Sequence, residues 1–282
     1  MRLRTASASD DTFHLVEGCR HEWHFVFPRI DQRVRDTHET AQRHLELERY
    51  QEGVKILTSV VSAYPEYVDA QDTLAWALKR NGEPDKAYET WKSIIRRTLA
   101  LLPSDFYFGR DHLLWGYPSN WSFLQAYLNL GSEHRRRGLV GEALSIFQNV
   151  LYLDPSNVRA PKSLIVRCFF RLHRPLDVLA FCERHHDDYD SDLLYGRALA
   201  LYQLGRKSDA AAALEGAIRR QPSIAKELAK QTHRTARDDR PRYNRIADEA
   251  IFYWREAGEF WSKTRGALAL VRRVLRERDL HV

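Results

Sequence analysis

Residues 138–155, GLVGEALSIFQNVLYLDP, decide the fold of this chain. The stretch begins at a glycine, places Ala143, Phe147 and Val150 at steps of four and three, and ends at Pro155. Apolar residues at this spacing lie on one face of a helix. A proline ends a helix because it has no backbone N–H to donate. The stretch therefore predicts an amphipathic helix between a glycine turn and a proline stop.

Related stretches occur at 49–65, 83–95 and 205–222, with a weaker one at 174–186. In each, a small or short residue stands where Ala143 stands in the first stretch. These small positions are Gly53, Ala87, Ala143, Val178 and Ala210, and their separations are 34, 56, 35 and 32 residues. Three of the four separations match a period of about 34 residues. The fourth equals one period plus 22 residues, which predicts a single insertion at about 98–120.

A second helical pattern precedes each of these stretches and ends in a turn signal. The signals are Asn81-Gly82, Arg137-Gly138 and Leu204-Gly205. Glycine is favoured just beyond the end of a helix because it adopts a left-handed backbone without steric cost. The repeating unit is therefore predicted to be a helix, a turn, a second helix and a stop.

This unit resembles the tetratricopeptide repeat. The best copy, 124–157, carries Leu130-Gly131, Gly138, Ala143, Phe147 and Pro155 at the family's Leu-Gly, turn-glycine, alanine, aromatic and proline positions. The fourth copy departs most, with Val178, Cys182 and Asp190 at the last three. The resemblance implies an all-α fold: a right-handed helical solenoid of about five helix-turn-helix repeats with helical caps at both ends.

The resemblance extends beyond the repeats. The segments LLWGYPSNWSFLQAYLNLG, before the third copy, and GEFWSKTRGALALV, near the end, are similar to segments of a group of bacterial tetratricopeptide proteins. That group shares an aromatic inserted arm and a terminal signature, which implies a bacterial protein defined by architecture rather than by an activity. The signature residues here are Gly258, Trp261, Thr264, Gly266, Ala267 and Leu268.

The predicted organisation has five parts. They are an N-terminal cap at 1–33, repeats 1 and 2 at 34–98, an aromatic insertion at 99–120, repeats 3 to 5 at 121–222, and a basic linker with C-terminal capping helices at 223–282. Each helix pair has too little apolar surface to form a core alone, so neighbouring pairs stack and the ends need caps.

The resemblance also implies where a partner would bind. In such arrays the first helices of the pairs line a concave groove that binds extended peptides or helices. The family's inward positions fall here on Asp72, Trp76, Lys79, Gln125, Asn129, Arg136, Arg167, Arg171, Tyr195 and Tyr202. Some relatives clamp a terminal carboxylate with Lys, Asn and Arg. Asn129, Arg167 and Arg171 are the right types, but Asp69 and Asp72 break the pattern, so ordinary groove charges are the favoured interpretation.

The insertion is rich in aromatic residues, including Phe106, Tyr107, Phe108, Trp115 and Tyr117. Two interpretations compete. The segment packs back onto the solenoid as extra core, or it presents an aromatic patch to a partner, as interface hot spots do. Packing is favoured because similar arms occur in the look-alike group.

Charge is concentrated in the last third of the chain. The net charge is +6, with +7 in residues 206–282 and −1 in 1–205. A basic cluster attracts polyanions with an affinity that falls steeply with salt, so nucleic-acid or polyanion binding through 219–245 is the alternative function. A solvated linker remains the simpler interpretation. The residues of this predicted patch are Arg219, Arg220, Arg234, Arg237, Arg240, Arg242 and Arg245.

Signs of chemistry are sparse. His21 and His24 flank a glutamate but stand three residues apart, whereas a helical zinc-protease motif needs four. Cys19, Cys168 and Cys182 are too few and too scattered for a disulfide framework or a four-cysteine zinc site. No phosphate-binding loop or nucleophile elbow is present in the sequence. The sequence predicts no enzyme, no cofactor and no metal.

Cellular setting and function follow from these patterns. No apolar run approaches the roughly 20 residues that a bilayer span requires, and three scattered cysteines fit a reducing, cytoplasmic setting. We therefore predict a cytoplasmic scaffold or adaptor that binds a protein or peptide, with nucleic acid as the less favoured partner and no membrane contact.

Overall fold

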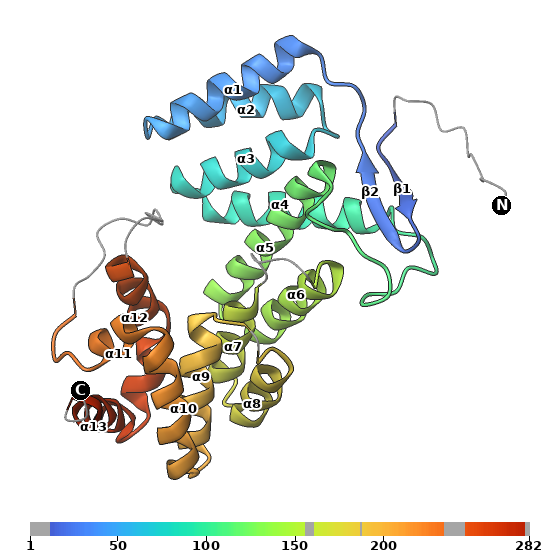
Figure 1. Cartoon of the computed structure of the whole chain (residues 1–282). Helices are drawn as coiled ribbons and strands as arrows, with labels where there is room; N and C mark the ends of the chain where they lie inside the picture. The colour runs from blue at the N-terminus through green and yellow to red at the C-terminus, as the bar shows by residue number, and fades with distance from the viewer. Residues whose placement is uncertain (1–11, 156–160, 187, 234–245, 280–282) are drawn as a thin grey trace. The chain divides into compact units, whose positions relative to one another are not determined.

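The computed structural model describes residues 12–155, 161–186, 188–233 and 246–279, and the chain divides into two compact units, Met1–Pro161 and Lys162–Val282. Both units are built mainly from helices packed in consecutive pairs, as the ribbon in Figure 1 shows. The all-α solenoid predicted from the repeat is therefore confirmed, with one small β-hairpin added near the N-terminus.

The first unit contains three helix pairs. Figure 1 shows the first two stacked in chain order. The pairs are α1 (Gln32–Glu46) with α2 (Tyr50–Ala63), α3 (Val68–Arg80) with α4 (Pro84–Leu99), and α5 (Trp121–Arg136) with α6 (Val140–Leu153).

The second unit contains two more pairs and three further helices. The pairs are α7 (Lys162–Arg171) with α8 (Pro175–Arg184) and α9 (Ser191–Gln203) with α10 (Lys207–Arg220). The remaining helices are α11 (Pro222–Leu228), α12 (Ile246–Lys263) and α13 (Ala267–Asp279). Each of the five predicted repeats is thus a helix pair.

The turns inside the five pairs share one backbone geometry. Gly82, Gly138 and Gly205 have φ between 78° and 86°, and the equivalent residues of the first and fourth pairs, Glu48 and His173, have φ of 60° and 55°. In every pair the next N–H donates to the carbonyl five residues earlier, at 2.9–3.0 Å. This bond closes the last turn of the first helix in a left-handed cap. The two non-glycine turns explain why the sequence showed only three turn signals.

The small position of each second helix is buried, as the repeat predicted. Ala87, Ala143, Val178 and Ala210 are all fully buried, and a Cβ at Gly53 would clash with the side chain of Leu45. Close packing of the two helices of a pair leaves room for little more than a methyl group there. The spacing seen in the sequence is therefore the spacing of helix–helix contacts.

The prediction of a helical cap at the N-terminus is wrong. The described part of 1–33 forms an antiparallel hairpin of β1 (His14–Cys19) and β2 (Glu22–Val26), with His14 opposite Val26. Aromatic and β-branched residues at alternate positions favour a strand over a helix, because alternate side chains point to opposite faces. Phe25 lies on the buried side and packs edge-on against Phe123 at 5.3 Å.

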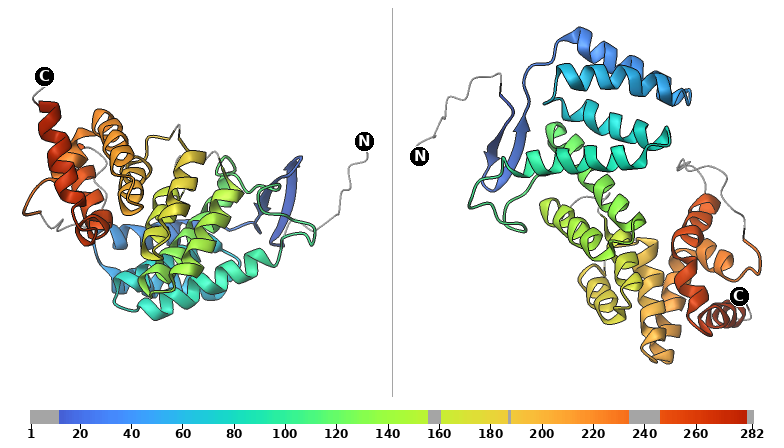
Figure 2. Two further views of the ribbon diagram at one scale, coloured as in Figure 1. Left: turned by 90° about the horizontal axis from the view of Figure 1, so that it is seen from below. Right: turned by 180° about the vertical axis from the view of Figure 1, so that it is seen from behind.

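The insertion between α4 and α5 packs against this hairpin, beside β1 and β2 in both views of Figure 2. Trp23 N donates to His112 O at 2.8 Å, and His112 N donates to His21 O at 2.7 Å. Buried Asn120, at the end of the 3₁₀ helix η1 (Pro118–Asn120), accepts from Phe25 N and donates to Trp23 O. Much of the insertion is therefore packed against the rest of the first unit, although Tyr107 is 69% exposed.

Candidate functional site

In the first unit, α3 and α5 lie side by side and share polar contacts along their length. Ser122 Oγ donates to Asp69 at 2.6 Å near the start of both helices, and Asn129 Nδ2 donates to Asp72 at 3.0 Å near the middle. Lys79 Nζ lies 3.3 Å from Glu133 near the end of both. We call this surface the open face. Its predicted groove residues are Asp72, Trp76, Lys79, Gln125, Asn129 and Arg136, of which Asp72 and Asn129 are half-buried and the rest exposed.

Asp72 is the most perturbed carboxylate of the open face. Its Oδ1 accepts hydrogen bonds from Trp91 Nε1 at 2.7 Å and from Asn129 Nδ2 at 3.0 Å. Burial raises the pKa of Asp72 from 3.8 to about 6, because these two bonds offset only part of the lost hydration and the charge of Asp69 adds to the rise. The carboxylate thus holds two side chains in place at an electrostatic cost.

Replacing Asp72 with asparagine should raise the free energy of unfolding at pH 7 by about 2 kcal/mol. The folded-state pKa of about 6 lies above the ordinary 3.8, so the folded chain binds this proton more tightly than the unfolded chain. The penalty is therefore absent below the ordinary pKa, grows as pH rises, and is complete above the folded-state pKa. Urea unfolding of wild type and Asp72→Asn between pH 4 and 7 measures it. Equal stability of the two at pH 7 would contradict the burial argument.

Glu133 is fully buried below the ends of α3 and α5. Arg136 Nε donates to its Oε1 at 2.9 Å, and Lys79 lies against its other oxygen. Burial alone would raise the pKa of Glu133, but the hydrogen bond from Arg136 and the charge of Lys79 outweigh it, so the pKa is lowered. One buried carboxylate therefore fixes two surface cations in position.

Trp76 is the large apolar side chain of the open face and is 41% exposed. Its ring meets Tyr50 edge-on at 6.1 Å, and the guanidinium of Arg80 lies 5.7 Å from its centroid. Arg80 also donates to Tyr50 Oη at 3.0 Å. These contacts hold the indole in one position while leaving part of it in solvent.

In the second unit, the corresponding face of α7 and α9 is covered by α12, which packs against α9 and α11 (Figure 2). Ser191 Oγ donates to Glu249 at 2.9 Å at one end of α9, and Gln203 Nε2 donates to Thr264 at 2.9 Å at the other. These contacts at the two ends of α9 show that α9 and α12 run in the same direction. We call this surface the covered face.

Arg167 is the centre of a buried ion cluster beneath α12. It is 4% exposed, donates through Nε to Asp192 at 2.9 Å, and lies 3.3 Å from Glu256 of α12. Burial alone would lower the pKa of Arg167, but the charges of Asp192 and Glu256 outweigh it and raise the pKa. The guanidinium is thus used to join α7, α9 and α12.

Aromatic side chains complete the covered face. Phe170 stacks on Phe260 at 5.3 Å, and Tyr195 contacts Tyr253 at 5.7 Å. Tyr195 also contacts Trp261, whose Nε1 donates to Tyr253 Oη at 3.0 Å. Apolar residues at helical spacing in the terminal segment predicted a capping helix. That spacing does not indicate the face on which the helix packs.

The prediction that Arg167 and Tyr195 line an open groove is therefore wrong. Arg167 is almost fully buried and Tyr195 is fully buried, both against α12. Arg171 remains partly exposed but lies 3.6 Å from Glu259, and the hydroxyl of Tyr202 lies under the turn at Gly266. Of the ten predicted groove residues, the six on α3 and α5 form the open face and the four on α7 and α9 contact the C-terminal segment.

The terminal signature residues have local structural roles. Gly266 forms the turn between α12 and α13 with φ of 87°, and Thr264 Oγ1 donates to Phe260 O at 2.8 Å. Trp261 and Ala267 are buried on either side of that turn. These contacts explain the residue types at this corner, while the similarity to the bacterial group remains a prediction.

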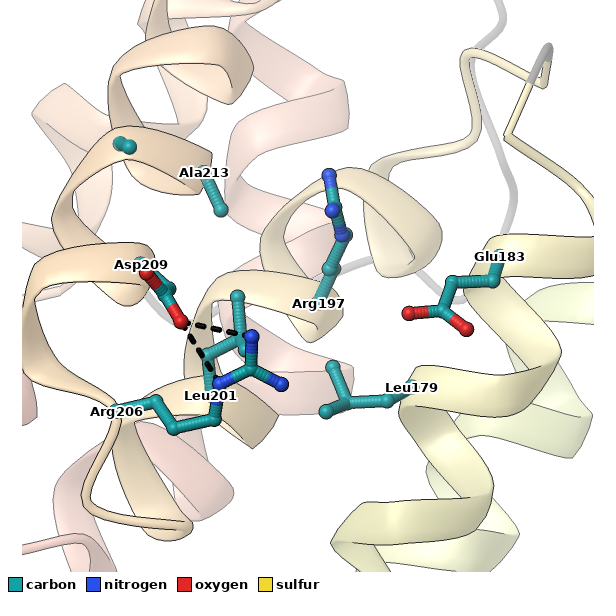
Figure 3. Close-up of a pocket in the computed structure, with 8 residues that line it drawn as sticks. Leu179, Glu183, Arg197, Leu201, Arg206, Asp209 and Ala213 are labelled. Atoms are coloured by element: carbon teal, nitrogen blue, oxygen red, sulfur yellow. Dashed lines mark hydrogen bonds and ion pairs between the residues drawn. The ribbon is translucent and has the colours of Figure 1, made fainter.

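A hollow that the sequence did not predict lies between α8 and α10, with α9 as its floor (Figure 3). Two adjoining cavities of about 390 and 490 Å³ share Glu183, Arg197, Ala212 and Ala213. Arg206 and Asp209 pair at 2.7 Å at its edge. The small side chains of α10 leave this space open, and no predicted groove residue is among those that line it.

The predicted polyanion patch is described only at its start. Arg219 and Arg220 are exposed in the last turn of α10, where Arg219 lies 3.9 Å from Glu215 and Arg220 lies over the ring of Tyr189. The other five arginines, Arg234, Arg237, Arg240, Arg242 and Arg245, lie outside the described residues.

The histidines and cysteines singled out in the sequence have local structural contacts. His21 Nδ1 bonds Asp111 at 2.8 Å, while His24 stacks on Tyr117 at 4.9 Å. Within the described ranges, no group of three or more His, Cys, Asp or Glu side chains is arranged to hold a metal ion. Cys182 is buried, and burial raises the pKa of its thiol to about 12. Among the helices that the structure describes, none is long and apolar enough to cross a membrane.

Among the described residues, these observations define a helical-repeat protein whose first-helix face is exposed on α3 and α5 and covered by α12 on α7 and α9. Family models described as tetratricopeptide repeat match two stretches of the chain, residues 124–157 and 183–225. The first match coincides with the best copy predicted from the sequence. Tetratricopeptide arrays are typically protein-interaction scaffolds, which bind protein or peptide partners without catalysis.

Two solved structures, with TM-scores of 0.51 and 0.50, have a similar helical-repeat fold. TPR-like repeats described as those of a Podosopora anserina kinesin light chain are 20% identical, with a TM-score of 0.51 over 67% of this chain and 95% of that chain. A thermophilic TPR protein of Thermus thermophilus is 17% identical, with a TM-score of 0.39 over 67% of this chain and 92% of that chain. The TPR2AB domain of yeast Sti1, solved as a complex with pHSP90, is 12% identical, with a TM-score of 0.33 over 88% of this chain and 95% of that chain. No curated protein matches the chain.

Proposed function

We propose that this chain is a non-catalytic, cytoplasmic adaptor that binds a peptide or helix of a partner protein on the open face of α3 and α5. The observation that carries the proposal is the contrast between the two units. The equivalent face of the second unit is covered by α12, whereas the open face exposes Trp76, Lys79, Gln125 and Arg136.

The side chains of the open face are fixed before any partner arrives. Asn129 is held by Asp72, Arg136 by Glu133, and Trp76 by Tyr50 and Arg80. Side chains that are already ordered lose less conformational entropy on binding. Tryptophan and arginine are also the residues most enriched among interface hot spots. A preorganised surface with both is well suited to recognise a partner.

Replacing Trp76 with alanine should weaken partner binding by at least tenfold without unfolding the chain, because the indole is partly exposed and supplies the main apolar contact. Affinity capture from native lysate, with nuclease and with mass spectrometry of what is retained, measures the effect. The control is Tyr107→Ala, which removes an exposed aromatic ring from the insertion.

Retention of the same partner by folded Trp76→Ala would overturn the proposal for the open face. Loss with Tyr107→Ala alone would move the binding site to the insertion. Retention that disappears with nuclease or moderate salt, and is indifferent to Trp76, would favour the alternative of polyanion binding through 219–245.

A further inference from the structure

The open face carries opposite charges at its two ends. Asp69 lies in the first turn of α3, with Asp72 one turn later. Lys79 and Arg80 lie in the last turn of α3, and Arg136 lies in the last turn of α5. The Ser122–Asp69 bond and the Lys79–Glu133 pair show that equivalent ends of α3 and α5 are adjacent. The face is therefore acidic at one end and basic at the other.

The basic end keeps an excess of positive charge. Glu133 is buried and shared by Lys79 and Arg136, and Arg137 Nε lies 3.4 Å from it. Arg137 also pairs with Asp85, so two carboxylates face three cations and one positive charge is left over. An acidic group that arrives at this end would meet attraction strengthened by the partly desolvated surface.

The covered face shows what kind of segment such a surface accepts. Helix α12 runs in the same direction as α9 and places Glu256 and Glu259 against Arg167 and Arg171 of α7. Its buried side chains are Ala250, Tyr253, Ala257, Phe260 and Trp261. The occupant is thus an amphipathic helix with glutamates beside its apolar face.

The repeat connects the two faces residue by residue. Arg171, which meets Glu259, precedes the small position Val178 by seven residues. At the same distance before Ala87 and Ala143 stand Arg80 and Arg136. Both of these arginines are exposed on the first unit. The position that receives a carboxylate of α12 in the second unit is therefore an arginine twice in the first.

We propose that the open face binds an amphipathic helix of a partner protein that lies parallel to α3 and α5. Its N-terminal end lies at Asp69 and Asp72, and carboxylates of its last two turns lie against Arg80 and Arg136. A helix has a partial positive charge at its N-terminus and a partial negative charge at its C-terminus, so this direction also matches its dipole to the charges of the face. The inference rests on the proposed function and adds the direction and the chemistry of the partner.

The test is selection from a phage library of 18-residue helices, with apolar residues fixed at helical spacing and random residues elsewhere, against the full chain. The expected winners have Asp or Glu in their last two turns and Lys or Arg in their first. For a synthetic peptide of the best sequence, fluorescence anisotropy should show at least tenfold weaker binding to Arg136→Gln, and unchanged binding to Arg96→Gln, an exposed arginine of α4.

A charge swap keeps the test independent of folding. A peptide in which the terminal carboxylates become lysines should lose binding to the wild type and regain part of it with Arg136→Glu. Selected peptides whose binding requires Trp76 but that carry no preferred distribution of charge would overturn this inference and leave the proposed function standing. The same conclusion follows if they carry acidic residues in their first turns and basic residues in their last. No enrichment, or winners indifferent to Trp76→Ala, would overturn both.

Discussion

Replacing Arg167 with methionine should destabilise the second unit by about 3–5 kcal/mol, the cost of leaving buried charges without their partner. Asp192 is 3% exposed, and Glu256 of α12 also points at this guanidinium. Removing Arg167 leaves Asp192 buried without its paired cation, while Glu256 keeps its contact with Arg255 at 3.3 Å. Chemical denaturation, followed by circular dichroism, measures the change in the free energy of unfolding.

The matched control is Arg171→Met on the same helix. Arg171 pairs with Glu259 of α12, but both side chains are more than a third exposed, and exposed pairs contribute about 0–1 kcal/mol. A second variant, Arg167→Met with Asp192→Asn, should recover part of the loss because the buried charge that Arg167 neutralised is also removed. Equal stability of Arg167→Met and Arg171→Met would show that the buried cluster does not hold α12.

Replacing Trp261 with alanine should cost about 3–5 kcal/mol, as expected for truncating a large buried aromatic side chain. Trp261 is 1% exposed, contacts Tyr195 of α9 and donates to Tyr253. Its loss leaves a cavity between α9 and α12 and removes one hydrogen bond. Amide hydrogen exchange should then show faster exchange along α12 and in α9, together with a lower midpoint of unfolding.

Phe252→Ala is the control for Trp261→Ala, because it also removes an aromatic ring from α12 but from a position that is 41% exposed. We expect a change of less than about 1 kcal/mol for it. Equal losses of stability in the two variants would show that burial of Trp261 does not hold α12 on the covered face.

The helix pairs were predictable because their signals are local. The steps from Ala143 to Phe147 and Val150 follow from the geometry of one helix, and the turn glycines follow from one backbone conformation. Glu48 and His173 adopt the same positive φ without being glycine, so their turns left no signal. The hairpin at His14–Val26 was missed because its strands are short and gain stability from contacts with the insertion, such as the bond of Phe25 N to Asn120, 95 residues further along the chain.

The candidate site was predictable only as a set of positions. The repeat predicted Asp72, Trp76, Asn129 and Arg136 on one side of their helices. In the structure Asn129 donates to Asp72, and Trp76 and Arg136 are exposed. The repeat placed Arg167 and Tyr195 on the equivalent side by the same reasoning, and they are buried beneath α12. A position within a repeat determines the direction of a side chain, but it does not determine what lies in front of that side chain.

The sequence by itself determined the number of helix pairs, their small contact positions and the place of the insertion, because each depends on residues within about one repeat of each other. The tertiary structure decided which first-helix face stays open. That choice depends on where Tyr253, Phe260 and Trp261 are buried. It also depends on the contact between Arg167 and Glu256, which are 89 residues apart in the sequence. Burial and charge pairing across such separations are set by the folded chain as a whole, so no local pattern records them.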